Sequence, residues 1–276
     1  MRLSLNQATI KRATVAEAVD VCVRHGISSI GLWREPVAEL GLDKSARLVE
    51  EAGLRVSSLC RGGFFTGVDQ REALADNRKA IDEAAALHAD CLVLVPGGVP
   101  DRDLIGARQR VADALAALAP YASDAGVKLA IEPMHPVFCA DRGVVSTLGQ
   151  ALDLAAPFSP DVVGVVVDAL HVWWDPDLPA QVARAAGRIF SYQVCDWITP
   201  LPADVLLGRG LPGDGHVDLP WLTALVEPFY SGDVEVEVFN ADVWAADFSS
   251  VAADLVRRHA AGWRPVVDGG HDRPAA

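Results

Sequence analysis

The stretch VVGVVVDALH, residues 162–171, decides the fold class, because an apolar run ends there in a carboxylate and a histidine. Nearly every residue before Asp168 is apolar and β-branched, which is typical of a strand that is buried on both faces. Such strands occur in parallel sheets whose faces are covered by helices. The sequence therefore predicts an α/β protein with a parallel sheet.

Runs of this kind recur along the chain, separated by amphipathic stretches rich in Ala, Leu and charged residues. We expect eight strands, at residues 2–6, 28–33, 56–60, 91–95, 127–132, 162–168, 189–195 and 234–239. Among the intervening stretches, 70–88 and 101–124 carry apolar stripes and are predicted helices. Gly26, Gly53 and Gly126 follow helical stretches, where a left-handed cap is expected.

Eight such units in about 260 residues match a single (β/α)8 TIM barrel. An open doubly wound sheet fits less well, because its phosphate-binding glycine motif is missing after the first strand. No linker divides the chain, so we expect one domain over residues 1–263. The periodicity is lost at residues 264–276, where we expect a mobile C-terminal tail.

The composition excludes several classes of protein. The chain has 276 residues, 51% of them hydrophobic, so it can bury a large core and is not disordered. Its net charge of −13 disfavours DNA or RNA as a partner. No apolar run reaches the roughly 18 residues of a membrane span, and the N-terminus lacks the apolar core of a signal peptide. Five scattered cysteines without a C-x-x-C spacing indicate reduced thiols in a cytoplasmic protein.

Polar side chains follow the last four predicted strands. The fifth strand ends in Glu132, the sixth in Asp168, the seventh carries Gln193 and the eighth carries Glu237. In a TIM barrel the strand ends meet at one rim, so these groups should converge. One acid at a strand end is more often a salt-bridge partner or a helix cap, but four consecutive strand ends favour a shared site.

Carboxylates that are brought together repel each other unless a cation lies between them. Oxygen ligands from Glu132, Asp168, Glu237 and the Gln193 amide suit Mn²⁺ or Mg²⁺ better than a thiophilic ion. Glu235 lies one layer deeper than Glu237 and is expected to form an ion pair inside the barrel.

Four motifs resemble those of the xylose-isomerase-like barrels, a family of sugar phosphate isomerases/epimerases that includes ketose 3-epimerases and inositol-catabolism enzymes. They are I-E-P at Glu132, D-x-x-H at Asp168 and His171, G-x-G-x-x-D from Gly213 to Asp218, and V-E-V-F around Glu237. The resemblance covers the chain to about Trp263. It implies that the strand-end residues named above hold the metal, and that Glu132 and Glu237 are acid/base groups on opposite faces of a sugar.

The strand-seven position departs from this family pattern, which usually reads H-x-x-D. Here Gln193 precedes Asp196, and an amide oxygen binds a metal more weakly than imidazole does. Mn²⁺ or Mg²⁺ remains the expected ion, with Co²⁺ and Zn²⁺ as alternatives.

Further residues are candidates for the reaction or for substrate binding. His171 is expected to bond a substrate oxygen, or alternatively to face solvent at a helix start. Arg209 resembles the family's arginine that neutralises substrate charge, or alternatively forms a surface salt bridge. The long 196–217 segment is expected to be a lid or binding loop. Candidate substrate-binding residues around the rim are Arg61, His135, Trp173, Trp174 and Trp197.

The leading hypothesis is a metal-dependent isomerase or epimerase that converts a sugar, keto-sugar or cyclitol through an enediolate. A lyase or dehydratase that acts on a sugar, cyclitol or glycoside at the same metal site is the alternative among enzymes. An abasic-site endonuclease is disfavoured, because its extra zinc-binding histidines are missing. A non-catalytic barrel subunit that has lost the metal is also retained, on the basis of Gln193. The apolar helix surfaces favour a homo-oligomer.

Overall fold

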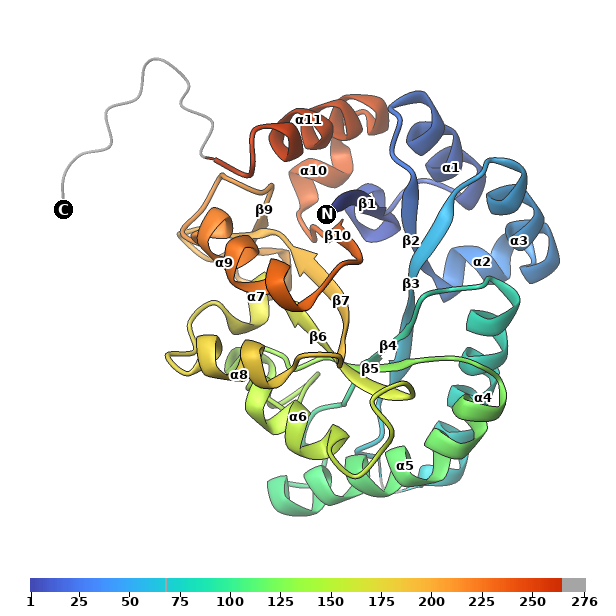
Figure 1. The fold of residues 1–276 in the computed structure, drawn as a ribbon, viewed down its shortest axis with the longest axis vertical. Helices are drawn as coiled ribbons and strands as arrows, with labels where there is room; N and C mark the ends of the chain where they lie inside the picture. The colour runs from blue at the N-terminus through green and yellow to red at the C-terminus, as the bar shows by residue number, and fades with distance from the viewer. Residues whose placement is uncertain (68, 265–276) are drawn as a thin grey trace.

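The computed structural model describes residues 1–67 and 69–264, and its centre is a closed parallel barrel (Figure 1). The barrel strands are β1 (Arg2–Asn6), β2 (Ser29–Trp33), β3 (Arg55–Gly63), β4 (Leu92–Val95), β5 (Leu129–Ile131), β6 (Val163–Asp168), β7 (Ile189–Val194) and β10 (Asp233–Val236). They pair in chain order, and β10 closes the barrel against β1. The predicted eight-stranded TIM barrel is confirmed, with strand ends that differ by a few residues.

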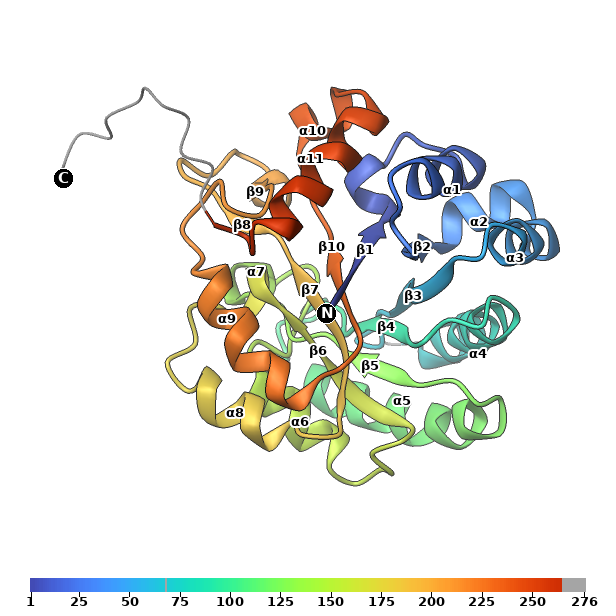
Figure 2. The same cartoon turned by 45° about the horizontal axis from the view of Figure 1, so that its top comes forward.

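Helices form the outer ring of the barrel (Figures 1 and 2). The α-helices are α1 (Val15–Arg24), α2 (Arg34–Leu40), α3 (Leu42–Glu51), α4 (Gln70–Ala86), α5 (Leu104–Asp124), α6 (Leu148–Ala155), α7 (Ala169–Val172), α8 (Leu178–Arg184), α9 (Leu219–Val226), α10 (Ala241–Ala245) and α11 (Phe248–Ala260). Short 3-10 turns are η1 (Gln7–Ile10), η2 (Pro136–Phe138), η3 (Val205–Leu207) and η4 (Glu227–Phe229). Because α11 packs beside α1, the last helix closes the ring.

Several local predictions hold in the structure. Gly26, Gly53 and Gly126 have φ angles of 66°, 67° and 69°, the left-handed conformation expected after a helix. All five cysteines are free thiols. No helix of the described residues is both long and apolar enough to cross a membrane. The predicted tail lies, from residue 265 onward, outside the described residues.

A buried carboxylate ties together the amino ends of four barrel strands. Asp233 starts β10, and its side chain is 1% exposed. Its carboxylate pairs with Arg2 at 2.8 Å and with Arg55 at 3.3 Å, and it accepts a hydrogen bond from Ser29 at 2.6 Å. These contacts hold the register at the end of the barrel opposite the candidate site.

Replacing Asp233 by Ala is expected to lower the free energy of unfolding by about 2 kcal/mol, as judged from urea denaturation. The two arginines are about half exposed and can be hydrated, so the main loss is the buried acceptor for Ser29. Asp233→Asn keeps one acceptor oxygen and should cost less. A stability of Asp233→Ala equal to that of the unmodified protein would contradict this role.

Candidate metal and active site

Three acidic side chains gather at the carboxyl ends of the barrel strands. Glu132 directly follows β5, Asp168 ends β6, and Glu237 directly follows β10. All three are at least 95% buried. Glu132 and Glu237 line a cavity of about 510 Å³ that opens at this end of the barrel. The predicted convergence of these strand ends is therefore present in the structure.

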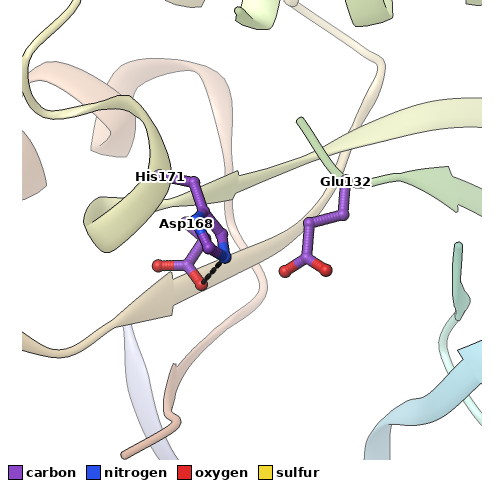
Figure 3. A group of neighbouring side chains, drawn as sticks. All are labelled: Glu132, Asp168 and His171. Carbon is purple, nitrogen blue, oxygen red and sulfur yellow. Dashed lines mark ion pairs between the residues drawn. The ribbon is translucent and has the colours of Figure 1, made fainter. Parts of the chain in front are cut away.

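The chain folds locally so that one oxygen of Asp168 faces the site. Its Oδ1 accepts a hydrogen bond from the Leu170 N–H at 2.8 Å and so caps α7. Its Oδ2 is buried and has no hydrogen-bond partner within the described part of the chain. Carboxylate oxygens of Glu132 and Asp168 and a ring nitrogen of His171 lie within 4.8 Å of one another. Figure 3 shows the Glu132 carboxylate beside the Asp168–His171 pair.

His171 brings to this cluster a buried ring nitrogen, Nε2, that has no hydrogen-bond partner among the described residues. It is fully buried on the single turn of α7, so the alternative of a solvent-facing residue is wrong. Its Nδ1 accepts from the His135 backbone N–H at 3.1 Å, which places the ring proton on Nε2. Burial and the Arg209 charge lower the pKa of His171 well below its usual value, so the ring is neutral. A protonated Nε2, 3.7 Å from Asp168 Oδ2, can donate to an oxygen but cannot ligate a metal.

Burial makes it costly to ionise all the acids of the cluster. Burial, and then the charges of Glu237 and Asp168, raise the pKa of Glu132 well above its usual value. Burial raises the pKa of Asp168 to about 6, against the charge of Arg209. Burial also raises the pKa of Glu237, and Arg209 opposes this shift. A cation placed among these groups would therefore stabilise the folded protein.

Arg209 supplies one positive charge to the cluster. Its Nη1 lies 2.7 Å from Glu237 Oε2 and 3.6 Å from Asp168 Oδ2. It is 3% exposed, so the alternative of a surface salt bridge is wrong. The segment expected to be a lid or binding loop contains a small antiparallel sheet, β8 (Asp196–Trp197) with β9 (Arg209–Gly210), which delivers this arginine.

Asp196 organises the loop that carries Arg209. Its carboxylate accepts hydrogen bonds from the backbone N–H groups of Trp197, Gly213 and Val217, at 2.9 to 3.0 Å. These bonds join both ends of the 196–217 segment. The aspartate that follows Gln193 by three residues is thus a loop anchor.

Gln193 presents an amide oxygen in the barrel interior. It is fully buried, and its Nε2 donates to Glu235 Oε1 at 3.1 Å. Its Oε1 has no hydrogen-bond partner within the described residues. Gln193 is paired in register with both Asp168 and Glu235 on the flanking strands. The free amide oxygen therefore belongs to the same layer as Asp168.

The prediction that Glu235 forms an ion pair is wrong. Glu235 instead accepts hydrogen bonds from neutral donors on three other strands: Asn6 at 2.7 Å, Ser58 at 2.9 Å, Ser57, and Gln193. Burial raises the pKa of Glu235, and the bonds from Ser57 and Asn6 oppose the shift. The cation of this region, Arg209, is paired with Glu237 one layer above.

Four predicted substrate-binding residues form an aromatic cluster beside the cavity. The His135 ring lies 4.7 Å from that of Trp197 and 5.6 Å from that of Trp174, and the Trp173 ring lies 6.0 Å from that of Trp197. None of the four lines the 510 Å³ cavity, whereas Arg61 does. Trp174 Nε1 donates to the His171 carbonyl at 2.8 Å, so the cluster also supports α7.

The cavity wall includes groups that sequence reasoning missed. The charged ones are Lys11 and Arg12, which follow η1, and Arg142, which lies between η2 and α6. The apolar ones are Trp33 and Phe239. Trp33 and Phe239 could have been found as the residues at the ends of the second and eighth predicted strands. The charged ones lie in loops, where no periodicity indicates the direction of a side chain.

The donor set fits a hard divalent ion. Asp168 Oδ2 and Gln193 Oε1 are buried oxygens without a hydrogen-bond partner in the described part of the chain, and the Glu132 carboxylate lies within 4.8 Å of Asp168. Carboxylate and amide oxygens are ligands suited to Mg²⁺ or Mn²⁺. The tautomer of His171 leaves these oxygens as the ligating atoms.

Comparisons with known proteins agree with the fold and the motifs. Inosose isomerase from Halalkalibacterium halodurans is 26% identical over 259 residues, which cover 88% of this chain and 90% of that protein. A solved protein from Sinorhizobium meliloti is 46% identical, with a TM-score of 0.92 over 95% of this chain and 98% of the other. The IolI protein with a bound zinc atom is 21% identical, with a TM-score of 0.82 over 95% and 98% of the two chains, and shares the fold.

The family model described as xylose isomerase-like TIM barrel matches residues 19–263. This match spans every strand end that carries a candidate ligand. The resemblance inferred from the four motifs is therefore confirmed, and the chain belongs to the xylose isomerase-like TIM barrel family.

Proposed function

We propose that this chain is a divalent-metal-dependent isomerase or epimerase of a keto-sugar or cyclitol, acting through an enediolate. The observation that carries the proposal is a group of buried acids, two of which, Glu132 and Glu237, line an open cavity. Beside them, buried oxygens of Asp168 and Gln193 have no hydrogen-bond partner among the described residues. Buried acids are costly unless they serve a cation or a proton transfer. The inosose isomerase relative makes an inosose the first substrate to test.

The proposed ion is Mn²⁺ or Mg²⁺, held by Glu132, Asp168, Gln193 and Glu237. When bound, it supplies a Lewis acid for the negative charge that develops on substrate oxygens. Glu237 gives Oε2 to Arg209, which leaves Oε1 for the site. The zinc bound by the IolI protein keeps Zn²⁺ and Co²⁺ in the set of ions to test.

Three side chains of this chain carry out the proton transfers of the proposed reaction. Glu132 removes the proton from the carbon beside the carbonyl, because a buried carboxylate at the cavity wall can reach the substrate as a general base. His171 donates its Nε2–H to the oxygen on which charge develops. Glu237, positioned by Arg209, begins the cycle protonated and gives that proton to the carbon from the opposite face of the sugar. Exchange with solvent then removes the proton that Glu132 took up and restores the one that Glu237 gave.

The test combines metal analysis with isotope exchange. Purified protein incubated in D2O with inososes and ketoses is expected to incorporate one deuterium beside the carbonyl, and chelator-treated protein is expected to incorporate none. Product mass separates this reaction from an elimination, in which mass is lost. A protein that holds no divalent ion and exchanges no proton of any substrate would overturn the proposal.

A further inference from the structure

Basic side chains gather at the mouth of the cavity. Lys11, Arg12, Arg61 and Arg142 line the same space as Glu132, and they are exposed or half-buried where Glu132 is buried. In a chain with a net charge of −13, four cations around one opening are unexpected by composition. Local positive charge at a cavity mouth attracts anionic ligands.

Two acids line the cavity together with two of these cations. Lys11 and Arg12 follow β1, and α2 on the neighbouring strand β2 contributes Glu35 and Glu39 to the lining. The numbers of charges are equal on this side. The remaining positive charge of the mouth therefore belongs to Arg61 and Arg142.

Arg61 has no acid partner of its own. Beneath it Arg34 pairs with Asp76 at 2.9 Å and with Glu83 at 2.5 Å, and Lys79 also approaches Glu83 at 3.8 Å. This cluster holds two cations and two acids, so its charges balance without Arg61. Among the described residues, Arg61 makes no ion pair.

The Arg61 guanidinium instead lies over the ring of Phe64, 4.3 Å from the ring centroid. Stacking on an aromatic face orients a guanidinium and leaves its N–H groups free to donate.

Arg142 lies on the loop that abuts the Arg61 loop. The two loops meet at Gly97, whose N–H donates to the Arg142 carbonyl at 2.7 Å. Gly97 also lies close to Phe64: a Cβ atom added to this glycine would be 3.2 Å from the Phe64 Cα. The acid nearest to Arg142 is its neighbour Asp141, at 3.5 Å and 62% exposed. An ion pair so exposed to solvent is weak, so Arg142 is free to bind an anion.

Apolar side chains, including Trp33, Phe64 and Phe239, line the same cavity as these arginines and the buried acids. A ligand that spans the cavity would place hydroxyl and carbonyl groups at the floor and a negative charge at the mouth. Guanidinium groups bind phosphate and carboxylate oxygens through paired N–H donors.

We propose that Arg61 and Arg142 bind an anionic substituent of the substrate, a phosphate or a carboxylate. This inference rests on the proposed function and narrows it: the substrate is an anionic keto-sugar or cyclitol. The arginines lie away from the reacting carbons and orient the substrate over Glu132 and Glu237.

The experiment measures anion binding separately from turnover. Calorimetric titration uses inorganic phosphate and acetate as probes, with the unmodified protein, Arg61→Gln, Arg142→Gln and the double variant. We expect the dissociation constant of the preferred probe to rise about 10-fold in each single variant and about 100-fold in the double variant. The probe that binds more tightly shows whether the anionic group of the substrate is a phosphate or a carboxylate.

Matched variants control for charge and for folding. Arg71 has a 93% exposed side chain, pairs within residues 1–67 and 69–264 only with Asp69, and is not among the residues that line the cavity. Arg71→Gln should therefore bind the probes like the unmodified protein. Arg61→Lys keeps the charge without the paired donors and should show an intermediate loss. Circular dichroism melts confirm that each variant is folded.

The outcomes separate the two proposals. Anion binding that depends on the arginines, found in a protein that exchanges no substrate proton, supports this subsite and refutes the isomerase. The inference is overturned if neither probe binds, if binding is unchanged in the folded double variant, or if neutral and anionic ketoses react equally well in all variants.

Discussion

Glu132→Gln is expected to lower kcat by at least about 10³-fold while the protein stays folded, because the substitution removes a general base without changing side-chain volume. The amide cannot take a proton from carbon, and it binds a divalent ion more weakly than a carboxylate does. The measurement is the steady-state rate and the deuterium exchange with whichever inosose or ketose reacts in the D2O screen described under the proposed function.

The same substitution should stabilise the chelator-treated protein. Folding raises the pKa of Glu132, so at neutral pH the ionised carboxylate destabilises the native state relative to the unfolded chain. This cost grows as the pH rises through the unfolded pKa of the group, and Gln removes it. The melting temperature of Glu132→Gln in chelator should therefore equal or exceed that of the unmodified protein.

Added Mn²⁺ should then reverse the order, because it raises the melting temperature of the unmodified protein far more than that of Glu132→Gln. Glu50→Gln, an exposed change on α3, controls for the loss of one charge. Unchanged turnover in Glu132→Gln would contradict the role of Glu132 and favour a non-catalytic barrel.

The position of Asp168 could be predicted from sequence because local rules determine it. An apolar run specifies a strand buried on both faces, and the polar residue that ends it must lie at the rim of the barrel. The short D-A-L-H turn then folds through the bond from the Leu170 N–H to Asp168, within three residues. Glu132 and Glu237 follow from the same reasoning on their own strands.

The surroundings of Glu235 could not be predicted in this way. Its hydrogen bonds join residues that are 42 to 229 positions apart in the chain, and they come from strands that do not all neighbour β10. Only the closed barrel brings Asn6, Ser57 and Gln193 to one interior point. An acid in a strand pattern suggests an ion pair, whereas the barrel supplies neutral donors.

Loops account for the remaining differences between the site predicted from the sequence and the site in the structure. Arg209 reaches the site because β8 and β9 pair and because Asp196 binds N–H groups near the far end of its loop. Arg142 reaches the cavity through a loop held at Gly97. No periodicity specifies the course of such loops, so the sequence does not place Lys11, Arg12 and Arg142 at the cavity, whereas Arg61 was expected at the rim.

The selectivity of the proposed site for its ion depends on the orientation of Gln193. An ionised Glu235 can only accept hydrogen bonds, so its contact at 3.1 Å must be with the amide nitrogen. That contact turns the amide oxygen away from Glu235, where it is free of partners. In the proposed site, Glu235 is therefore a positioning residue for the Gln193 oxygen, at the strand position where the family resemblance led us to expect a histidine.

Gln193→His is therefore expected to raise the ratio of Zn²⁺ to Mn²⁺ affinity by about 100-fold, because imidazole is a softer ligand than an amide oxygen. Glu235 can accept the second ring N–H of the new histidine, as it accepts the amide now. Glu235→Gln should lower the affinity for Mn²⁺ about 10- to 100-fold with Gln193 intact, since the acceptor that orients the amide is lost.

Competition with a chelating dye measures both affinities without turnover, and Gln109→His, on the exposed face of α5, controls for a surface histidine. A role of Gln193 in packing alone would alter melting temperature but leave the Zn²⁺ to Mn²⁺ ratio unchanged. The ratio of the two affinities therefore distinguishes a metal ligand from a residue that only packs in the barrel interior. An unchanged ratio in a folded Gln193→His protein would show that Gln193 is not a ligand of the metal.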